Sequence, residues 1–237
     1  MIEMRNGSIR LFTVFGITVY LHWSWFLVAV IFIGLPQFGL NSIWGVFVYL
    51  ALFGIVLIHE FGHALACRSV GGKADTIVLW PLGGIAFVQP PQRPGAVLWS
   101  IAAGPLVNVV LVPITFVLMY AIVGGIPQGQ ASGLKYFIIA ITYINLALLI
   151  FNILPIYPLD GGQILQAILW FFVGRTKSLR IASGIGLVCA VVGGAACLVY
   201  GETWLFILAL FIGWQAYNGW RVAQYMAMQD KQDGDRR

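Results

Sequence analysis

Long apolar stretches, separated by short polar or glycine- and proline-rich breaks, follow one another along nearly the whole chain. A helix of about 20 residues crosses the roughly 30 Å hydrocarbon core of a bilayer, because it rises about 1.5 Å per residue. The pattern therefore predicts an all-α polytopic membrane protein with about six transmembrane helices. The stretches are residues 17–36, 42–66, 96–123, 134–154, 179–200 and 203–223.

Residues 73–94 break this helical pattern. Two short β-prone runs, residues 76–80 and 85–88, flank a Pro-Leu-Gly-Gly turn, and neither run is long enough to cross a bilayer. We expect a short membrane-associated β-hairpin between the second and third spans. It should pack against protein or enter a wet cavity, because open strand edges are not tolerated against lipid. An irregular interfacial loop is the alternative.

Composition and charge agree with this class. With 60% apolar and 9% charged residues, the chain is expected to form a single membrane domain over residues 1–228, followed by a disordered polar tail over residues 229–237. The basic residues are scattered between the spans, which argues against a nucleic-acid partner. With six spans, twelve of the thirteen Lys and Arg residues fall on the side of the termini, and only Lys135 lies opposite. The positive-inside rule then predicts cytoplasmic N- and C-termini.

The candidate chemistry centres on His59, Glu60 and His63, an H-E-x-x-H pattern near the end of the second apolar stretch. On a helix both imidazoles share a face and can bind one zinc ion, while Glu60 acts as general base on a zinc-bound water. Ionisable groups are costly in hydrocarbon and usually mark a functional site there. Two core histidines beside an incidental glutamate are the structural alternative.

Asp160 is the predicted third zinc ligand. The second and fourth spans both run inward, so Asp160 and the two histidines should reach the same cytoplasmic depth. Asp160 precedes Gly161-Gly162 at a helix start, and a helix N-cap is its alternative or additional role. His22 is a rival ligand, but its aromatic neighbours favour an interfacial or supporting histidine.

Asn108, Asn145 and Asn152 are amides within apolar helices, so each must find a hydrogen-bond partner. Asn152 stands closest to Asp160 in the sequence and could donate to a peptide carbonyl or a developing oxyanion. Asn152 and Asn108 are our predicted substrate-binding residues. Hydrogen bonding between helices is the alternative for all three amides, and it is the preferred role for Asn145.

Together these motifs resemble the site-2 protease family of intramembrane zinc metalloproteases. Residues 59–63 (HEFGH) and 152–161 (NILPIYPLDG) are similar to the family patterns H-E-x-x-H and N-x-x-P-x-x-P-x-D-G. Residues 104–108 (GPLVN) resemble a further family motif. Residues 16–23 and 81–84 are similar to the compact prokaryotic branch, which lacks PDZ and CBS domains. Gln163 departs from the family, which often has Arg after Asp-Gly-Gly.

The resemblance implies a six-span bundle in a prokaryotic cell membrane, with the site near the cytoplasmic side. It implies His59, His63 and Asp160 as zinc ligands, Glu60 as the base, and Asn152 as a substrate contact. The implied activity is cleavage of a single-pass membrane protein in or near its transmembrane segment, in regulated intramembrane proteolysis. A divalent metal carrier and a non-cleaving pseudoprotease that binds membrane segments are the alternatives.

Overall fold

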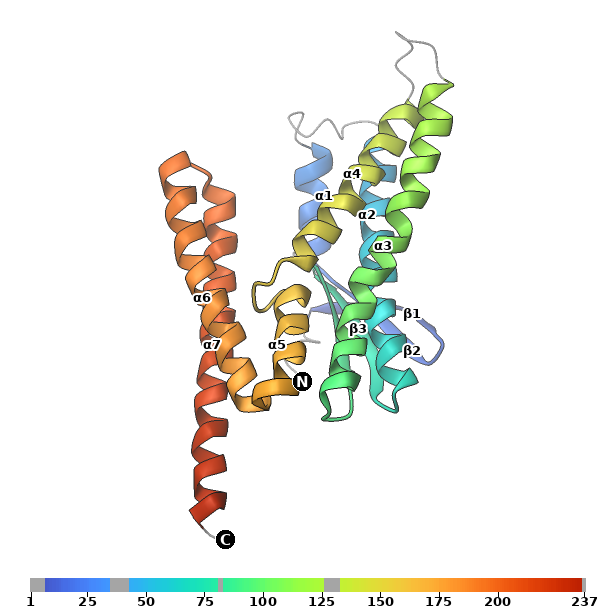
Figure 1. Ribbon diagram of the computed structural model, residues 1–237. Coiled ribbons are helices and arrows are strands. Elements are labelled where there is room, and N and C mark those ends of the chain that lie inside the picture. The colour runs from blue at the N-terminus through green and yellow to red at the C-terminus, as the bar shows by residue number, and fades with distance from the viewer. Residues whose placement is uncertain (1–6, 35–42, 81–82, 126–132, 236–237) are drawn as a thin grey trace. The chain divides into compact units, whose positions relative to one another are not determined.

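The computed structural model describes residues 7–34, 43–80, 83–125 and 133–235. The chain divides into two compact units. The first unit comprises residues 1–91 and 103–150, and the second comprises residues 92–102 and 151–237. Figure 1 labels most of the elements, which in chain order are β1 (Ser8–Val14), β2 (Ile17–His22), α1 (Ser24–Gly34), α2 (Ile43–Ser69), β3 (Lys73–Trp80), β4 (Gly83–Gln89), α3 (Pro94–Gly124), α4 (Gly133–Ile153), α5 (Asp160–Val173), α6 (Arg175–Tyr200) and α7 (Thr203–Asp235).

Four helices among the described residues are long and apolar enough to cross a membrane, namely α2, α3, α4 and α6. They correspond to the second, third, fourth and fifth apolar stretches of the sequence. α3 continues as one helix through Pro105 and Pro113.

The prediction that the first span begins at residue 17 is wrong, because residues 17–22 form strand β2. Phe15 and Gly16, with φ angles of 52° and 70°, turn the chain between β1 and β2. Two consecutive positive φ values suit a tight hairpin turn, and glycine adopts them without steric cost. Helix α1 starts only at Ser24, and residues 35–36 of the predicted span lie outside the described residues.

The fold is therefore not all-α, because it contains a four-stranded sheet of order β1-β2-β3-β4. β1 and β2 are antiparallel, β2 and β3 are parallel, and β3 and β4 are antiparallel. The last pair is formed by the two runs for which the sequence predicted a hairpin; its turn, residues 81–82, lies outside the described residues. β4 stands at one end of this strand order.

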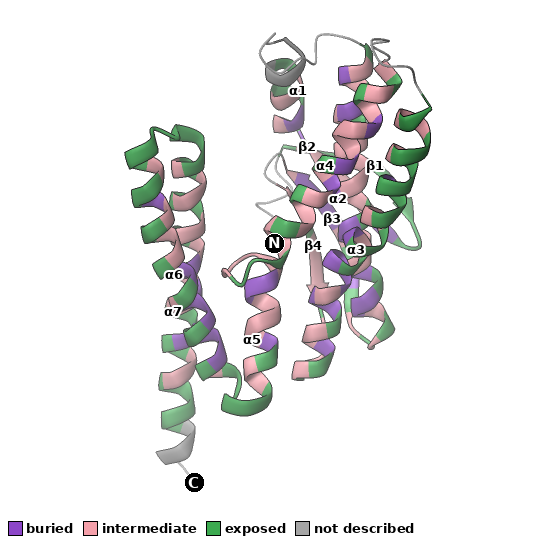
Figure 2. Ribbon diagram, turned by 45° about the horizontal axis from the view of Figure 1, so that its top comes forward, coloured by how far each residue is buried: buried purple, intermediate pink, exposed green. Residues whose placement is uncertain are grey.

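The core of the first unit lies between the sheet and α2. Ile17 and Val19 of β2, with Ile77 and Leu79 of β3, are fully buried in one cluster that also contains Ala64 and Cys67 of α2. Figure 2 shows buried residues on the strands and on the adjoining part of α2. Apolar side chains on one face of a strand and one stripe of a helix bury each other in this way. This packing holds the last turns of α2 firmly against the sheet.

The second unit contains α5, α6 and α7, which follow one another in the sequence. Gly186 of α6 lies so close to α7 that an added Cβ would stand 3.1 Å from the Cβ of Ala216. Small residues allow such close helix packing. α7 continues to Asp235 and includes residues 229–235, where the sequence predicted a disordered tail.

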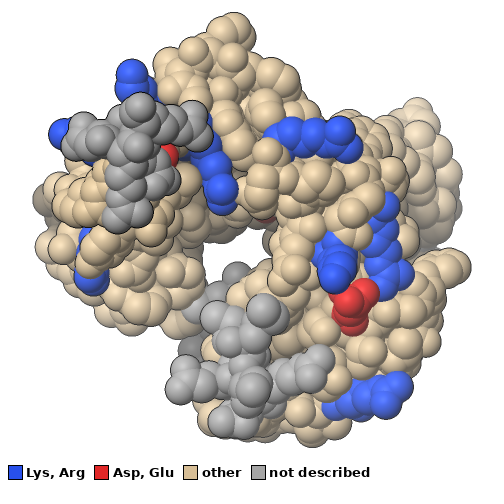
Figure 3. Space-filling view, turned by 90° about the horizontal axis from the view of Figure 1, so that it is seen from below, with Lys and Arg blue, Asp and Glu red and all other residues tan. Residues whose placement is uncertain are grey.

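Basic side chains concentrate near the connections between elements. In the first unit Arg68 lies in the last turn of α2 and Lys73 begins β3. In the second unit Arg175, Lys177 and Arg180 occupy the first turns of α6. Figure 3, a view from below, shows Lys and Arg side chains at several places on this face, with few Asp and Glu side chains among them. Basic residues at the ends of apolar helices are typical of membrane spans.

Candidate active site

His59 and His63 bring their metal-binding nitrogens together on one face of α2. Both rings are buried, and their Nε2 atoms lie 3.1 Å apart. Two zinc–nitrogen bonds of about 2.0–2.1 Å at a tetrahedral angle would place the nitrogens about 3.3 Å apart. The observed separation fits one shared zinc ion, as the i, i+4 spacing predicted.

Gly104 of α3 leaves the space in front of these nitrogens open. An added Cβ would lie 2.2 Å from Nε2 of His63 and 2.8 Å from Nε2 of His59. Real Cβ contacts are longer than this, so any larger residue would displace the two rings. The space that a Cβ would fill is therefore available to a metal ion. The imidazole nitrogens beside it are donor atoms that zinc prefers.

Two amides connect His59 to neighbouring helices. Nδ1 of His59 lies 2.5 Å from Oδ1 of Asn108, and Nδ2 of Asn108 donates to Oδ1 of Asn145 over 2.7 Å. Both asparagines are fully buried. The preferred role of Asn145 in bonding between helices is confirmed by this contact. The sequence predicted Asn108 to bind substrate, whereas both polar atoms of its side chain are bonded to protein groups.

Strand β4 seats the carboxylate of Glu60. The backbone N–H of Ala86 donates to Oε2 of Glu60 over 2.8 Å. Gly84 allows this approach, because an added Cβ would lie 2.2 Å from Cγ of Glu60. Reasoning from the sequence missed both residues, although Pro-Leu-Gly-Gly was noted as a motif and its second glycine is Gly84.

Asp160 is the first residue of α5, in the second unit. Leu159 occupies the N-cap position and no side chain caps the helix there, so the N-cap alternative for Asp160 is wrong. The following glycines pack against the chain that precedes the helix. An added Cβ at Gly161 would lie 2.3 Å from the carbonyl oxygen of Ile153, and one at Gly162 would lie 2.2 Å from the backbone nitrogen of Tyr157.

Two further residues of this segment were singled out in the sequence. Asn152 lies in the last turn of α4 and is partly exposed. Gln163, which replaces the family arginine, donates from Nε2 to the carbonyl oxygen of Pro158 over 2.9 Å. Gln163 therefore braces the loop between α4 and α5 through a neutral hydrogen bond rather than through a charge.

His22, the rival ligand, has partners within the sheet region. Its Nδ1 lies 2.5 Å from Oγ of Ser24, and its ring stacks on Trp80 with centroids 4.2 Å apart. The hydroxyl and the indole orient the imidazole at the point where β2 ends. This environment suits a histidine that supports its surroundings.

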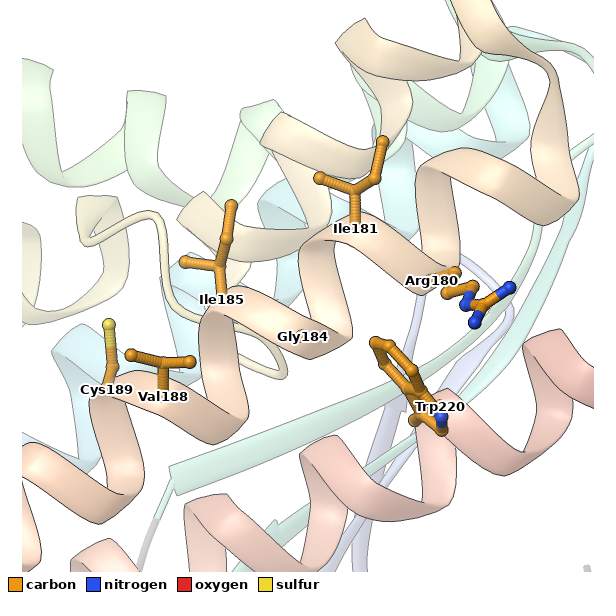
Figure 4. Close-up of a pocket in the computed structure, with 7 residues that line it drawn as sticks. All are labelled: Arg180, Ile181, Gly184, Ile185, Val188, Cys189 and Trp220. Carbon is orange, nitrogen blue, oxygen red and sulfur yellow. The ribbon is translucent and has the colours of Figure 1, made fainter.

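A cavity of about 480 Å³ lies between α6 and α7 in the second unit. Figure 4 shows that Arg180 and Trp220 stand at one end of it, with the guanidinium 5.0 Å from the indole ring. Ile181, Ile185 and Val188 line the remainder. Because this lining contains no histidine or carboxylate, the cavity offers no general base and no metal ligand set of the kind found on α2.

A family model and several known proteins match this chain. Residues 47–129 and 119–193 match the model of peptidase family M50. A zinc metalloprotease of Methanocaldococcus jannaschii is 33% identical over 222 residues, which cover 92% of this chain and 62% of that protein. Stage IV sporulation protein FB of Bacillus subtilis is 36% identical over 168 residues, covering 69% of this chain and 52% of that protein.

A solved structure is similar as well. The site-2 protease from Methanocaldococcus jannaschii superposes with a TM-score of 0.65 at 30% sequence identity, over 90% of this chain and 95% of that one. The chain nevertheless spans only 62% of the length of the archaeal zinc metalloprotease that it resembles in sequence.

Proposed function

Because the chain belongs to peptidase family M50, we propose that it is a zinc metalloendopeptidase that hydrolyses a peptide bond in or near the transmembrane segment of a membrane protein. One observation carries the proposal: the Nε2 atoms of His59 and His63 are paired on α2, and β4 holds the carboxylate of Glu60, the residue that follows His59. A structural pair of histidines would need neither the open space at Gly104 nor a seated base.

Asp160 is our proposed third ligand. Two imidazoles and one carboxylate, with one position left open, form a common catalytic zinc set. Its support is twofold: the N-x-x-P-x-x-P-x-D-G pattern and the place of Asp160 at the first residue of α5. The tight packing of Gly161 and Gly162 on the preceding loop keeps this carboxylate in a defined position.

In the proposed reaction, His59, His63 and Asp160 would hold the zinc ion, which would supply acidity to a bound water and polarisation to the carbonyl of the peptide bond to be cleaved. Glu60 removes the proton from the attacking water and returns it to the leaving amine. The Ala86 N–H keeps the Glu60 carboxylate oriented between these two transfers. Asn152 donates from its amide to the substrate carbonyl, where negative charge develops. Burial of the histidines keeps bulk water from competing for the site.

We propose that the sheet prepares the substrate for cleavage. A transmembrane helix hides its peptide bonds, so it must unwind locally before attack, and strand addition to a sheet edge holds a peptide extended. β4 supports this role, because it ends the strand order and lies against α2 beside Glu60. The N–H of Ala86 points to Glu60 and therefore away from β3. Every second residue of an antiparallel strand points its peptide N–H in the same direction, so those of Gly84 and Val88 also point away from β3.

The proposed setting is a prokaryotic cell membrane. Besides the four candidate spans, we assign crossings to α7 and to the segment that begins with α1, which gives six. The basic residues then favour cytoplasmic termini and a catalytic site near the cytoplasmic face. The hairpin of β3 and β4 would lie in the membrane between the second and third spans, and the substrate would be a single-pass membrane protein.

One experiment tests the proposed function. The wild type and Glu60→Gln are purified, their bound zinc is measured, and each is incubated with a reporter transmembrane substrate. We expect cleavage by the wild type alone, with equal zinc in both proteins, because Gln keeps the shape of Glu60 but cannot accept the proton. Cleavage by Glu60→Gln at the wild-type rate would contradict the assignment of the base.

The alternatives give different results in the same experiment. A divalent metal carrier would cleave with neither protein and would move zinc into liposomes. A pseudoprotease would retain the reporter segment without cleaving it or transporting metal. Removal of zinc by a chelator, followed by its restoration, should abolish and then recover cleavage only if the protein is a metalloprotease.

A further inference from the structure

Three buried side chains from three helices form one hydrogen-bonded chain behind the metal-binding face of α2. His59 of α2 meets Asn108 of α3, and Asn108 meets Asn145 of α4, over 2.5 and 2.7 Å. Both asparagines are fully buried, so water does not compete for these contacts. Through these two hydrogen bonds, Asn145 constrains which ring nitrogen of His59 carries the proton.

The polarity of the chain determines which nitrogen of His59 carries the proton. Oδ1 of Asn145 can only accept, so Asn108 must turn its Nδ2 toward it. Oδ1 of Asn108 then faces His59 and can only accept, so Nδ1 of His59 donates. A neutral imidazole protonated on Nδ1 has its lone pair on Nε2, the atom that faces His63. The reverse polarity would protonate Nε2 and block metal binding.

The bond between helices that Asn145 makes uses only one of the two polar atoms of its side chain. Its Nδ2 is buried and finds no acceptor within the part of the chain that the structure describes. One turn earlier, Thr142 already makes a polar contact between α4 and α3: its hydroxyl lies 3.2 Å from the carbonyl oxygen of Thr115, and it shares its one proton with the carbonyl oxygen of Ile138 at 2.8 Å. A buried donor without an acceptor costs free energy. The contact that offsets this cost is the one in which Oδ1 of Asn145 accepts a hydrogen bond from Asn108.

We propose that Asn145 is a positioning residue that, through Asn108, holds His59 in the tautomer able to bind zinc. The inference rests on the proposed function, because it assumes that Nε2 of His59 is a zinc ligand. Outer partners that orient a ligating histidine typically change metal affinity by about 10–100-fold when they are removed. Asn145 extends this effect one residue further, to a side chain that touches neither the metal site nor the substrate.

The test measures zinc affinity by competition with a chelator of known affinity, using the full chain in lipid nanodiscs. Asn145→Leu should weaken zinc binding about 10-fold or more, since Leu offers no acceptor. Asn145→Asp restores an acceptor-only oxygen and should stay within about threefold of the wild type. Thr142→Val is the matched control, because it also removes a buried polar contact between α3 and α4 and should leave zinc affinity unchanged.

A spectroscopic measurement on the metal-free wild type adds a result that does not depend on how well the variants fold. Nitrogen-15 NMR of labelled histidines should show His59 protonated on Nδ1 and unprotonated on Nε2, and Asn145→Leu should shift the ring toward a mixture of tautomers. An Nε2-protonated His59 in the wild type would overturn the proposal. So would an equal loss of affinity in Asn145→Leu and Thr142→Val, because a general packing defect would then explain both.

His59→Ala separates this inference from the proposed function on which it rests. If His59→Ala binds zinc as tightly as the wild type, the assignment of the metal site itself is wrong. If His59→Ala loses zinc while Asn145→Leu binds it normally, the metal site stands and only the role of Asn145 is refuted.

Discussion

Replacing Gly104 with alanine perturbs the metal site by adding a single carbon atom. The new Cβ would lie 2.2 Å from Nε2 of His63, about 1.2 Å short of the 3.4 Å at which ordinary contacts begin. The imidazole can swing aside, but this takes Nε2 away from the metal position. Zinc–ligand distances tolerate only about 0.2 Å, so a displacement several times larger should break this bond.

We expect Gly104→Ala to weaken zinc binding by about 100-fold or more, equivalent to about 3 kcal/mol. Stability should not fall in parallel, because alanine is favoured over glycine within a helix by about 0.5–1 kcal/mol. Competition with a chelator measures the affinity, and thermal unfolding of the metal-free protein measures the stability. The two readings together separate a local effect on the ligands from a general loss of folding.

Gly54→Ala is the matched control, since Gly54 lies on α2, the helix that carries both histidines. A Cβ added there meets no atom within 4 Å. This variant should bind zinc as the wild type does and unfold at the same or a slightly higher temperature. If Gly104→Ala bound zinc within twofold of Gly54→Ala, the proposed position of the metal in front of the two Nε2 atoms would be wrong.

Three other substitutions address the base, the substrate edge and the packing of the second unit. Gly84→Ala should lower kcat at least about 10-fold while zinc binding is retained, because it displaces the Glu60 side chain; normal cleavage would show that the base is not seated by β4. Val88→Pro removes an N–H at the outer edge of β4, so it should reduce cleavage of a helical substrate more than cleavage of an unstructured peptide. An equal effect on both substrates would count against strand addition. Gly186→Ala would place a Cβ 2.3 Å from the carbonyl oxygen of Tyr157, so unfolding measurements should show a loss of about 1–3 kcal/mol, whereas Gly193→Ala, with no atom within 4 Å, should show none.

Local patterns in the sequence predicted the long helices. Uninterrupted apolar stretches with glycine- and proline-rich breaks led to α2, α3 and α4 with nearly correct bounds. The same criterion failed at residues 17–22, because a short apolar run can be either a strand or the start of a helix. The pairing of β2 with β3, which are more than 50 residues apart in the chain, decides between them, and no local pattern shows that contact.

Local sequence patterns likewise predicted only part of the candidate site. His59, Glu60 and His63 follow from a spacing within one helix, so the sequence was sufficient to bring them together. Gly84 and Gly104 matter because their missing Cβ atoms leave room for side chains of α2, and such room is visible only when the elements are packed. Asn108 and Asn145 belong to different helices, and their mutual hydrogen bond depends on how those helices face each other.

The central claim is that His59, His63 and Asp160 hold one zinc ion. Zinc K-edge X-ray absorption of the loaded protein counts the ligands around the metal directly. The wild type should show two imidazole nitrogens at about 2.0–2.1 Å with lighter oxygen ligands, and His59→Ala should show one fewer imidazole. Asp160→Ala should keep both imidazoles but bind zinc less tightly. Sulfur ligation, or an unchanged imidazole count in His59→Ala, would contradict the claim.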